Sequence, residues 1–298
     1  MEFNKPGLTF EEQAEQLLRR GMTGQKDAII EKLKAVNYYR LSGYWFPYRN
    51  PDNSFIAGTS LDKVWKHYAF DRQMRLLILD AIERVEISIR TQICHEHVLK
   101  YDAFSYLETV KLPGLNPEEF SDFIYKVKRE VDRAKDKEQY LISFFEKHGD
   151  VHTMPPLWMA VETMSFGRMV SLYRGCEPKI KKAVARQYGL TDTVLDTWLL
   201  SLNMIRNICA HHGRLWNKVL GLKPLIPRKG AAWHEPVEIS NDRLFVVLTI
   251  LKYLLDKIAP QSAWDQRLLK LLEDYPRVSR QKMGFPQNWQ DCPIWIPS

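Results

Sequence analysis

A polar segment near position 210 carries the residue types that chemistry on a phosphate requires. It reads RNICAHH from Arg206 to His212. At about 100° per residue of a helix, one face presents a single polar stripe, made of Asn203, Arg206, Asn207, Ala210, His211 and Arg214. An arginine offers a planar fork of donors that fits a phosphate, and a histidine exchanges protons near neutral pH. Arg206 and His211 together therefore suit phosphoryl chemistry.

The neighbouring His212 falls on the opposite side of the same predicted helix. That side is apolar and includes Ile205, Ile208, Cys209 and Trp216. We therefore expect His211 to be the exposed candidate for acid/base work. His212 is expected to be a core histidine whose ring is satisfied by a hydrogen bond.

No other motif supplies a metal or a phosphate cradle. The sequence contains no P-loop, no HExxH and no acidic cluster that would hold magnesium, so we expect no metal and no cofactor. Arginine would then have to neutralise the phosphate in the transition state. Because RNA supplies its own nucleophile, the 2′-hydroxyl, metal-free cleavage to a 2′,3′-cyclic phosphate and a 5′-hydroxyl is feasible. From the spacing alone, a structural polar network buried by partner helices is an interpretation at least as good.

Positive charge gathers in the same part of the chain. The net charge is +7, and residues 165–230 carry twelve basic side chains against three acidic ones. A local basic excess is the electrostatic footprint of a polyanion partner. We expect an RNA-binding surface there, for which the candidates are Lys179, Lys181, Lys182, Arg186, Arg214 and Lys218. The alternative is that the excess spreads over different faces once the chain folds.

Three further residues are candidates to support the motif. Glu86 and Arg90 have the spacing of a favourable helical ion pair. A structural pair is the preferred interpretation, and a carboxylate that orients the catalytic Arg206 or His211 is the alternative. Glu162 lies on an apolar predicted helix and needs a partner, for which Arg206 is a candidate.

Two other groups allow more than one interpretation. Cys94, His95 and His97 resemble a set of metal ligands, but the two histidines lie about 200° apart on a helix, so we expect no zinc there. The aromatic residues between positions 38 and 48, beside Arg40 and Arg49, are suited to stacking on unpaired bases. Packing in a core or an interface is the preferred interpretation of that cluster.

The elements that position these residues are all expected to be helices. Helical periodicity predominates and no segment alternates apolar and polar residues, so the predicted class is all-α. The longest pattern covers residues 61–101 without Gly or Pro and predicts the spine of the fold. Thr9 and Glu12 form a capping box ahead of a helix that Gly21 stops. Other helices are expected at 26–37, within 118–147, and at 156–173, 178–188, 191–216, 242–258 and 263–274.

A loop rich in Pro, Asn and Gly ends near Thr59 and marks a seam in the chain. We therefore expect a small N-terminal helical module over residues 1–58 and a helical domain that carries the motif over residues 59–282. An extended tail rich in aromatic residues and proline, over residues 283–298, is expected to pack on the body.

Composition limits the class of protein further. Of the 298 residues, 45% are hydrophobic and 12% aromatic, which excludes a mainly disordered chain. No run of about 18 apolar residues is present, so no membrane span is expected. Glu11, Glu12 and Glu15 argue against an N-terminal export signal. The four cysteines stand alone, as reduced thiols do, and we expect a cytoplasmic protein.

Five blocks occur in order along the sequence: YYRLSGYWFPYR at 38–49, FDRQMRLLILDAIERVEISIR at 70–90, PLWMAVETMSFG at 156–167, RNICAHHGRLWN at 206–217 and MGFPQNW at 283–289. Within the fourth block, Arg206 to His211 match the R-x4-6-H motif of HEPN-domain ribonucleases, in the form R-N-x-x-x-H. Together the five blocks resemble the Abi family of bacterial abortive-infection proteins, the AbiD/AbiF group.

The resemblance implies a HEPN-like helical bundle that forms a homodimer, in which the motifs of two copies meet at one RNA-cutting site. It implies that Arg206 binds the scissile phosphate, that His211 is the acid/base and that Asn207 orients one of them, while His212 leaves two imidazoles as candidates. It also implies a role in phage defence, either as a toxin held by a small non-coding RNA antitoxin or as a ribonuclease triggered by infection.

Three hypotheses for function follow. The first is a metal-independent HEPN endoribonuclease of an abortive-infection or toxin–antitoxin system. The second is an RNA-binding protein that scaffolds a small non-coding RNA without cutting it. The third is a HEPN-like partner protein that is modified with a nucleotide and silenced by its regulator.

Overall fold

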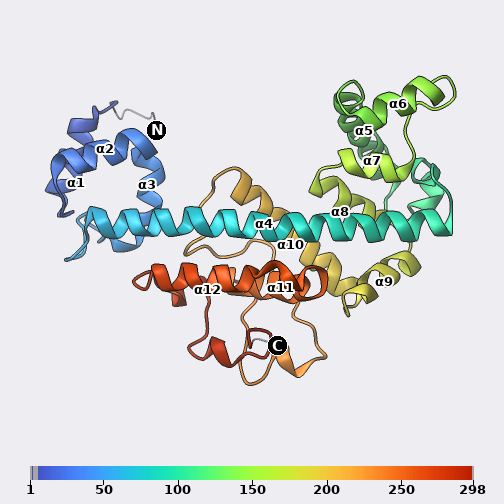
Figure 1. The fold of residues 1–298 in the computed structure, drawn as a ribbon. Helices are drawn as coiled ribbons and strands as arrows, with labels where there is room; N and C mark the ends of the chain where they lie inside the picture. Colours follow the sequence, from blue (N-terminus) through green and yellow to red (C-terminus); the bar gives the residue numbers. More distant parts are fainter. Residues whose placement is uncertain (1, 3–5, 297–298) are drawn as a thin grey trace.

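The chain folds around one very long helix. The computed structural model describes residues 2 and 6–296, and within them the chain forms twelve α-helices and no β-strand, which confirms the predicted all-α class. Helix α4 (Leu61–Lys100) runs along the molecule from end to end (Figure 1). Its apolar residues at steps of three and four, such as Met74, Ile78 and Val85, are buried. The predicted spine is therefore confirmed.

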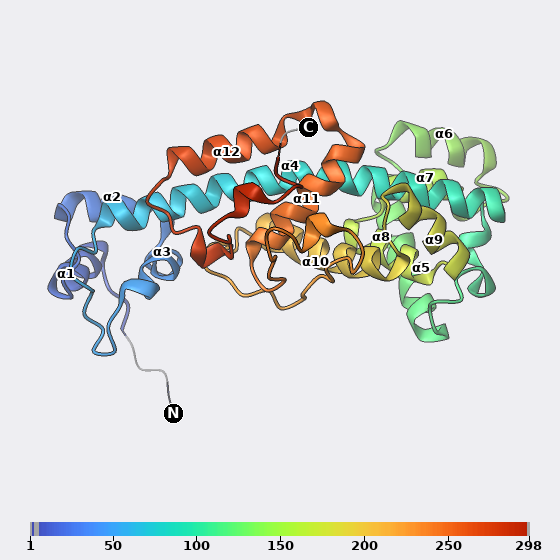
Figure 2. The same cartoon turned by 90° about the horizontal axis from the view of Figure 1, so that it is seen from below.

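The other helices are arranged along α4 (Figures 1 and 2). Its N-terminal end carries α1 (Phe10–Arg19), α2 (Lys26–Val36) and α3 (Tyr38–Trp45). Its C-terminal end carries α5 (Pro117–Ala134), α6 (Gln139–His148), α7 (Leu157–Thr163) and α8 (Phe166–Gly175). Packed along its length are α9 (Pro178–Gln187), α10 (Asp192–Ala210), α11 (Leu244–Ile258) and α12 (Trp264–Asp274). Residues 1, 3–5, 297 and 298 of the expected terminal segments lie outside the described residues.

The helix expected over residues 156–173 is broken, and that prediction was wrong. Helix α7 ends at Thr163 because Met164 turns extended and its carbonyl accepts a hydrogen bond from Arg90 at 2.9 Å. The Ser165 hydroxyl then donates to Glu130 at 2.8 Å, and α8 begins at the next residue. Two long-range contacts therefore interrupt a pattern that is locally helical.

Helix α10 ends at Ala210, six residues before the predicted end at Trp216, so that boundary was also wrong. The Gly213 N–H donates to the Ile208 carbonyl at 2.7 Å, and the His212 N–H donates to the Cys209 carbonyl at 3.0 Å. These two bonds form a Schellman cap, in which the residue at the turn adopts a left-handed conformation. That residue is His212, with φ of 58°. Glycine is the usual occupant of such a position, because a Cβ is unfavourable there.

A buried carboxylate fixes the chain directly after this cap. Asp71 of α4 is fully buried and accepts hydrogen bonds from the Trp216 N–H at 2.7 Å and from the Leu215 N–H at 3.2 Å. It also accepts from the Tyr44 hydroxyl at 2.7 Å and pairs with Arg75 at 2.6 Å. Burial raises the pKa of Tyr44, so its hydroxyl stays a donor. We call these four side-chain and backbone contacts to Asp71 the anchor network.

Helix α3 holds the same loop from a second direction. The Arg40 guanidinium donates to the His212 carbonyl at 2.6 Å, and the Arg214 guanidinium donates to the Gly43 carbonyl at 2.5 Å. Arg75 adds a longer bond to the Gly213 carbonyl at 3.3 Å. The loop over residues 211–217 is therefore attached to both α3 and α4.

Replacing Asp71 with Asn should destabilise the fold strongly. The change removes the charge that balances buried Arg75, and breaking one side of a buried ion pair costs roughly 3–5 kcal/mol. Urea unfolding of Asp71→Asn measures the loss. The matched control is Asp62→Asn on the same helix, whose pair with Lys66 is exposed and worth less than about 1 kcal/mol. Equal stability of the two variants would contradict the anchor role of Asp71.

Replacing His212 with Gly should stabilise the fold by about 1 kcal/mol, because the left-handed conformation costs glycine nothing. The control is His211→Gly, since His211 has φ of −91° and gains nothing from glycine there. Urea unfolding curves of the two variants decide between them. A loss of stability in His212→Gly as large as in His211→Gly would show that the backbone at His212 is not strained.

Candidate functional site at the end of helix α10

Four polar side chains at the end of α10 have no protein partner. Asn207, His211 and His212 are exposed and Arg206 is half-buried. Within residues 2 and 6–296, none of these side chains makes a hydrogen bond or an ion pair, although their neighbours Arg40, Arg75 and Arg214 all do. The site thus combines a fixed backbone with free functional groups.

The prediction of a core position for His212 was wrong. The error follows from the helix boundary: beyond Ala210 the helical wheel no longer applies, and the left-handed turn carries His212 outward. Its carbonyl, not its ring, is bonded, to Arg40. Both imidazoles are therefore accessible to a ligand.

Arg206 lies next to a largely buried carboxylate of α4. Glu86 has 16% of its side chain exposed and pairs with Arg90 at 2.8 Å, so the structural ion pair that the spacing favours is present. Burial raises the pKa of Glu86, and the charges of Arg90 and Arg206 oppose that rise. Glu86 thus offers Arg206 a nearby negative charge without being bonded to it.

Glu162 does not pair with Arg206, in contrast to the expectation from the sequence. Its side chain is 57% exposed and lies 3.5 Å from Arg90. Because Glu162 remains in water, burial imposes no need for a strong partner. Glu86, and not Glu162, is the carboxylate whose charge acts with that of Arg206.

Four of the basic candidates lie on helix α9, which packs beside α4. Helix α9 follows α4 from Ser88, which bonds Tyr188 at 2.8 Å, to Lys100, which pairs with Glu177. At 1.5 Å per residue of helix, this stretch is about 18 Å long and starts beside Glu86. The residues of α9 proposed to bind RNA are exposed Lys179, Lys182 and Arg186 and half-buried Lys181.

Two of the basic candidates belong to the loop after α10. Arg214 leaves the predicted stripe, because the helix ends before it, and bonds Gly43 of α3. Lys218 is half-buried. Arg214 therefore holds the loop through one nitrogen, while the rest of its guanidinium has no other bond among the described residues.

The aromatic cluster of α3 divides between core and surface. Tyr44 and Trp45 are buried, and Tyr38 packs edge-on against Trp45 with ring centroids 5.0 Å apart. Tyr39, in contrast, is 86% exposed, next to the Arg40 that bonds the loop. Core packing accounts for the buried rings, and Tyr39 is free to stack on a ligand.

The residues Cys94, His95 and His97 do not come together. His97 is buried, its ring lies 3.1 Å from the Ser105 hydroxyl, and burial lowers its pKa to about 4, so it is neutral. His95 is exposed. Across the described part of the chain, no three His, Cys, Asp or Glu side chains are placed to hold a metal ion.

Sequence reasoning missed Asp71, Arg75 and Tyr44 of the anchor network, and it missed the role of Arg40 in holding the loop. One signal was available: Asp71 and Arg75 are four apart and lie among the apolar positions Phe70, Met74 and Ile78. A charged pair on the apolar side of a helix is expected to be buried and bonded. Arg40 gave no such signal, because its partner is a backbone carbonyl 172 residues away.

No helix in residues 2 and 6–296 combines the length and the apolarity that crossing a bilayer requires.

Comparison with known proteins identifies the family. The model of a family described as Abi-like protein matches residues 31–217, more than half of the chain. The match includes the anchor network, the free side chains of the motif and helix α9, and it ends before α11, α12 and the aromatic tail. No curated protein and no solved structure matches the chain. The chain belongs to the family of Abi-like proteins, and so is connected in general terms with abortive infection, a bacterial defence against phage.

Proposed function

We propose that this protein is a metal-independent endoribonuclease of the HEPN type that acts in phage defence. The observation that carries the proposal is the set of free side chains Arg206, Asn207, His211 and His212 on a backbone fixed by the anchor network. A rigid backbone with unpaired polar groups is the arrangement that catalysis requires, since groups already in place need no reorganisation during the reaction.

In the proposed reaction, Arg206 binds the non-bridging oxygens of the scissile phosphate. The 2′-oxygen attacks phosphorus as a histidine removes its proton, and the bond from phosphorus to the 5′-oxygen breaks. A protonated histidine gives its proton to the leaving 5′-oxygen. The products carry a 2′,3′-cyclic phosphate and a 5′-hydroxyl, and no metal takes part. Asn207 orients the phosphate or a histidine.

A homodimer is part of this proposal. Each chain has one R-N-x-x-x-H motif, at residues 206–211. A second copy of the chain would supply the second set of catalytic groups. The exposed position of the motif at a helix end permits two copies to meet there. A small non-coding RNA antitoxin that holds the nuclease inactive, and a cytoplasmic location, belong to the same proposal.

His211→Ala should reduce RNA cleavage by at least 100-fold in excess EDTA, because loss of an acid/base group typically costs a factor of 10²–10⁴. The assay uses labelled total RNA and maps the fragment ends. Arg206→Ala should also lose cleavage, and Glu86→Gln should change it less. Matched controls are His148→Ala and Arg133→Ala, an exposed histidine and an exposed arginine in the last turns of other helices.

RNA binding retained by His211→Ala would separate catalysis from binding. Intact RNA that binds wild type and His211→Ala equally would instead favour the second function, an RNA scaffold without nuclease activity. Cleavage by wild type that stops in EDTA would contradict the metal-independent mechanism.

Removing the basic side chains of α9 should weaken RNA binding in a salt-dependent way. For a single strand, the slope of log affinity against log salt is about −0.7 for each phosphate that the protein neutralises. We expect a triple substitution of Lys179, Lys182 and Arg186 by Ala to make this slope less negative by roughly 2. The control replaces exposed Arg129, Arg133 and Lys137 by Ala. Equal slopes for the two triple variants would remove α9 from the RNA-binding surface.

A further inference from the structure

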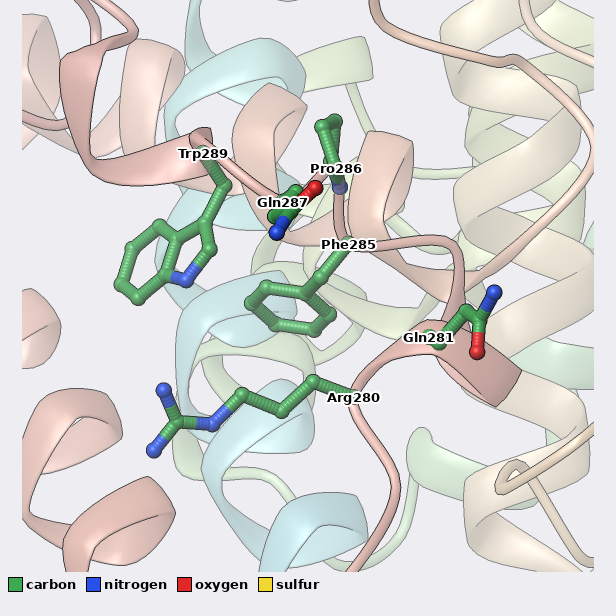
Figure 3. A pocket seen from close by; sticks show the side chains of 6 residues that line it. All are labelled: Arg280, Gln281, Phe285, Pro286, Gln287 and Trp289. Atoms are coloured by element: carbon green, nitrogen blue, oxygen red, sulfur yellow. The ribbon is translucent and has the colours of Figure 1, made fainter.

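A pocket in the segment after α12 has the composition of a base-binding site. It has a volume of about 560 Å³ and is lined by Arg280, Gln281, Phe285, Pro286, Gln287 and Trp289. Figure 3 shows the rings of Phe285 and Trp289 and the guanidinium of Arg280 around the same space. The volume lies within the range of sites for small molecules, about 300–1,000 Å³. We call it the tail pocket.

The apolar wall of the tail pocket is rigid. Phe285 is only 6% exposed and Trp289 only 5%, and their rings are edge-on with centroids 5.4 Å apart. Phe285 also packs on Phe245 of α11, at 4.6 Å between centroids. Gly284, with φ of 84°, has no room for a side chain because Arg243 lies against it. The wall is therefore formed before any ligand arrives.

The polar groups of the tail pocket are largely uncommitted. Among the described residues, Arg280 makes one side-chain hydrogen bond, to the Leu272 carbonyl at 3.3 Å, and no ion pair with a carboxylate. The amides of Gln281 and Gln287 are exposed and make no side-chain hydrogen bond there. Of the six residues that line the pocket, Arg280 alone carries a charge. The pocket thus offers uncommitted donors and acceptors beside one guanidinium.

The same segment touches the loop that follows the motif. The Lys282 ammonium lies 5.5 Å from the ring centroid of Trp216, the residue whose backbone N–H donates to Asp71. Arg243 donates to the Lys282 carbonyl and to the Asn217 side chain, both at 3.3 Å. The segment that forms the tail pocket is therefore held against the loop that carries the free histidines.

We propose that the tail pocket binds one unpaired guanine base of the RNA that the motif cuts. The base lies against the exposed edges of Phe285 and Trp289, the Arg280 fork faces O6 and N7, and the Gln287 amide bonds its remaining edge. The substrate class rests on the proposed function, whereas the pocket chemistry stands on its own. Cleavage would then occur at a fixed distance from a guanine.

Binding of guanosine 5′-monophosphate to the full chain tests the pocket without any cleavage. His211→Ala serves as the background, so that the nuclease is silent. Tryptophan fluorescence or NMR should show that Arg280→Gln weakens binding at least tenfold, and that cytidine 5′-monophosphate binds at least tenfold more weakly than the guanosine compound. The matched control is Arg277→Gln, an exposed arginine three residues earlier that does not line this pocket. Gln287→Leu is a second test of the pocket at an exposed position, where the fold tolerates a change, and it should also weaken binding of the guanosine compound.

Three outcomes would overturn the proposal: no difference between guanosine and cytidine monophosphates, equal binding by Arg280→Gln and Arg277→Gln, or full displacement of the nucleotide by equimolar inorganic phosphate. The last result would mean that the pocket takes a phosphate and not a base. In an active chain, Arg280→Gln should abolish the guanine preference at mapped ends while His211-dependent cutting continues. Mononucleotide binding by a chain that never cuts RNA would disprove the nuclease and leave the pocket standing.

Discussion

The hydrogen bonds that the buried Asp71 carboxylate accepts determine the geometry of the whole candidate site. Buried backbone N–H groups outside a helix need acceptors, and a buried charge needs several donors. Asp71 meets both needs at once, because it accepts from two backbone N–H groups after α10 as well as from Tyr44 and Arg75. Asp71 thus fixes Leu215 and Trp216 from α4, while Arg40 and Arg214 hold the same loop from α3.

Polar side chains around the end of α10 fall into two sets. One set is bonded to the protein: Arg40, Asp71 and Arg75 bind backbone groups of the loop, and Arg214 of the loop donates to the Gly43 carbonyl of α3. The other set, Arg206, Asn207, His211 and His212, has no partner in the described part of the chain. The strained backbone of His212 agrees with this division, since strain persists where surrounding contacts enforce it.

Local interactions made much of the fold predictable. The capping box of Thr9 and Glu12 is present, with bonds of 3.2 and 2.8 Å, because it involves residues three apart. The 40-residue spine followed from its own periodicity. The end of α10 and the break at Met164 depend on Asp71 and Arg90, which lie far away in the sequence. The helical periodicity continues beyond both points, so the predicted helices were too long. The wrong orientation of His212 came directly from the first of these errors. Arg206, Asn207 and His211 were found from residue type and spacing, whereas the residues that hold them were not.

The contacts that build the site also set when it forms. Arg40 reaches the His212 carbonyl across 172 positions of the chain, Arg214 reaches Gly43 across 171, and Asp71 reaches Trp216 across 145. Contacts between such distant positions close large loops, and proteins rich in them fold slowly. Helices such as α1 and α5, which carry their own capping boxes, can form early. The loop after α10 becomes ordered only after α3, α4 and α10 have come together. During synthesis, the residues of the motif are therefore present before the contacts that fix their positions can form, because those contacts require the chain up to residue 217.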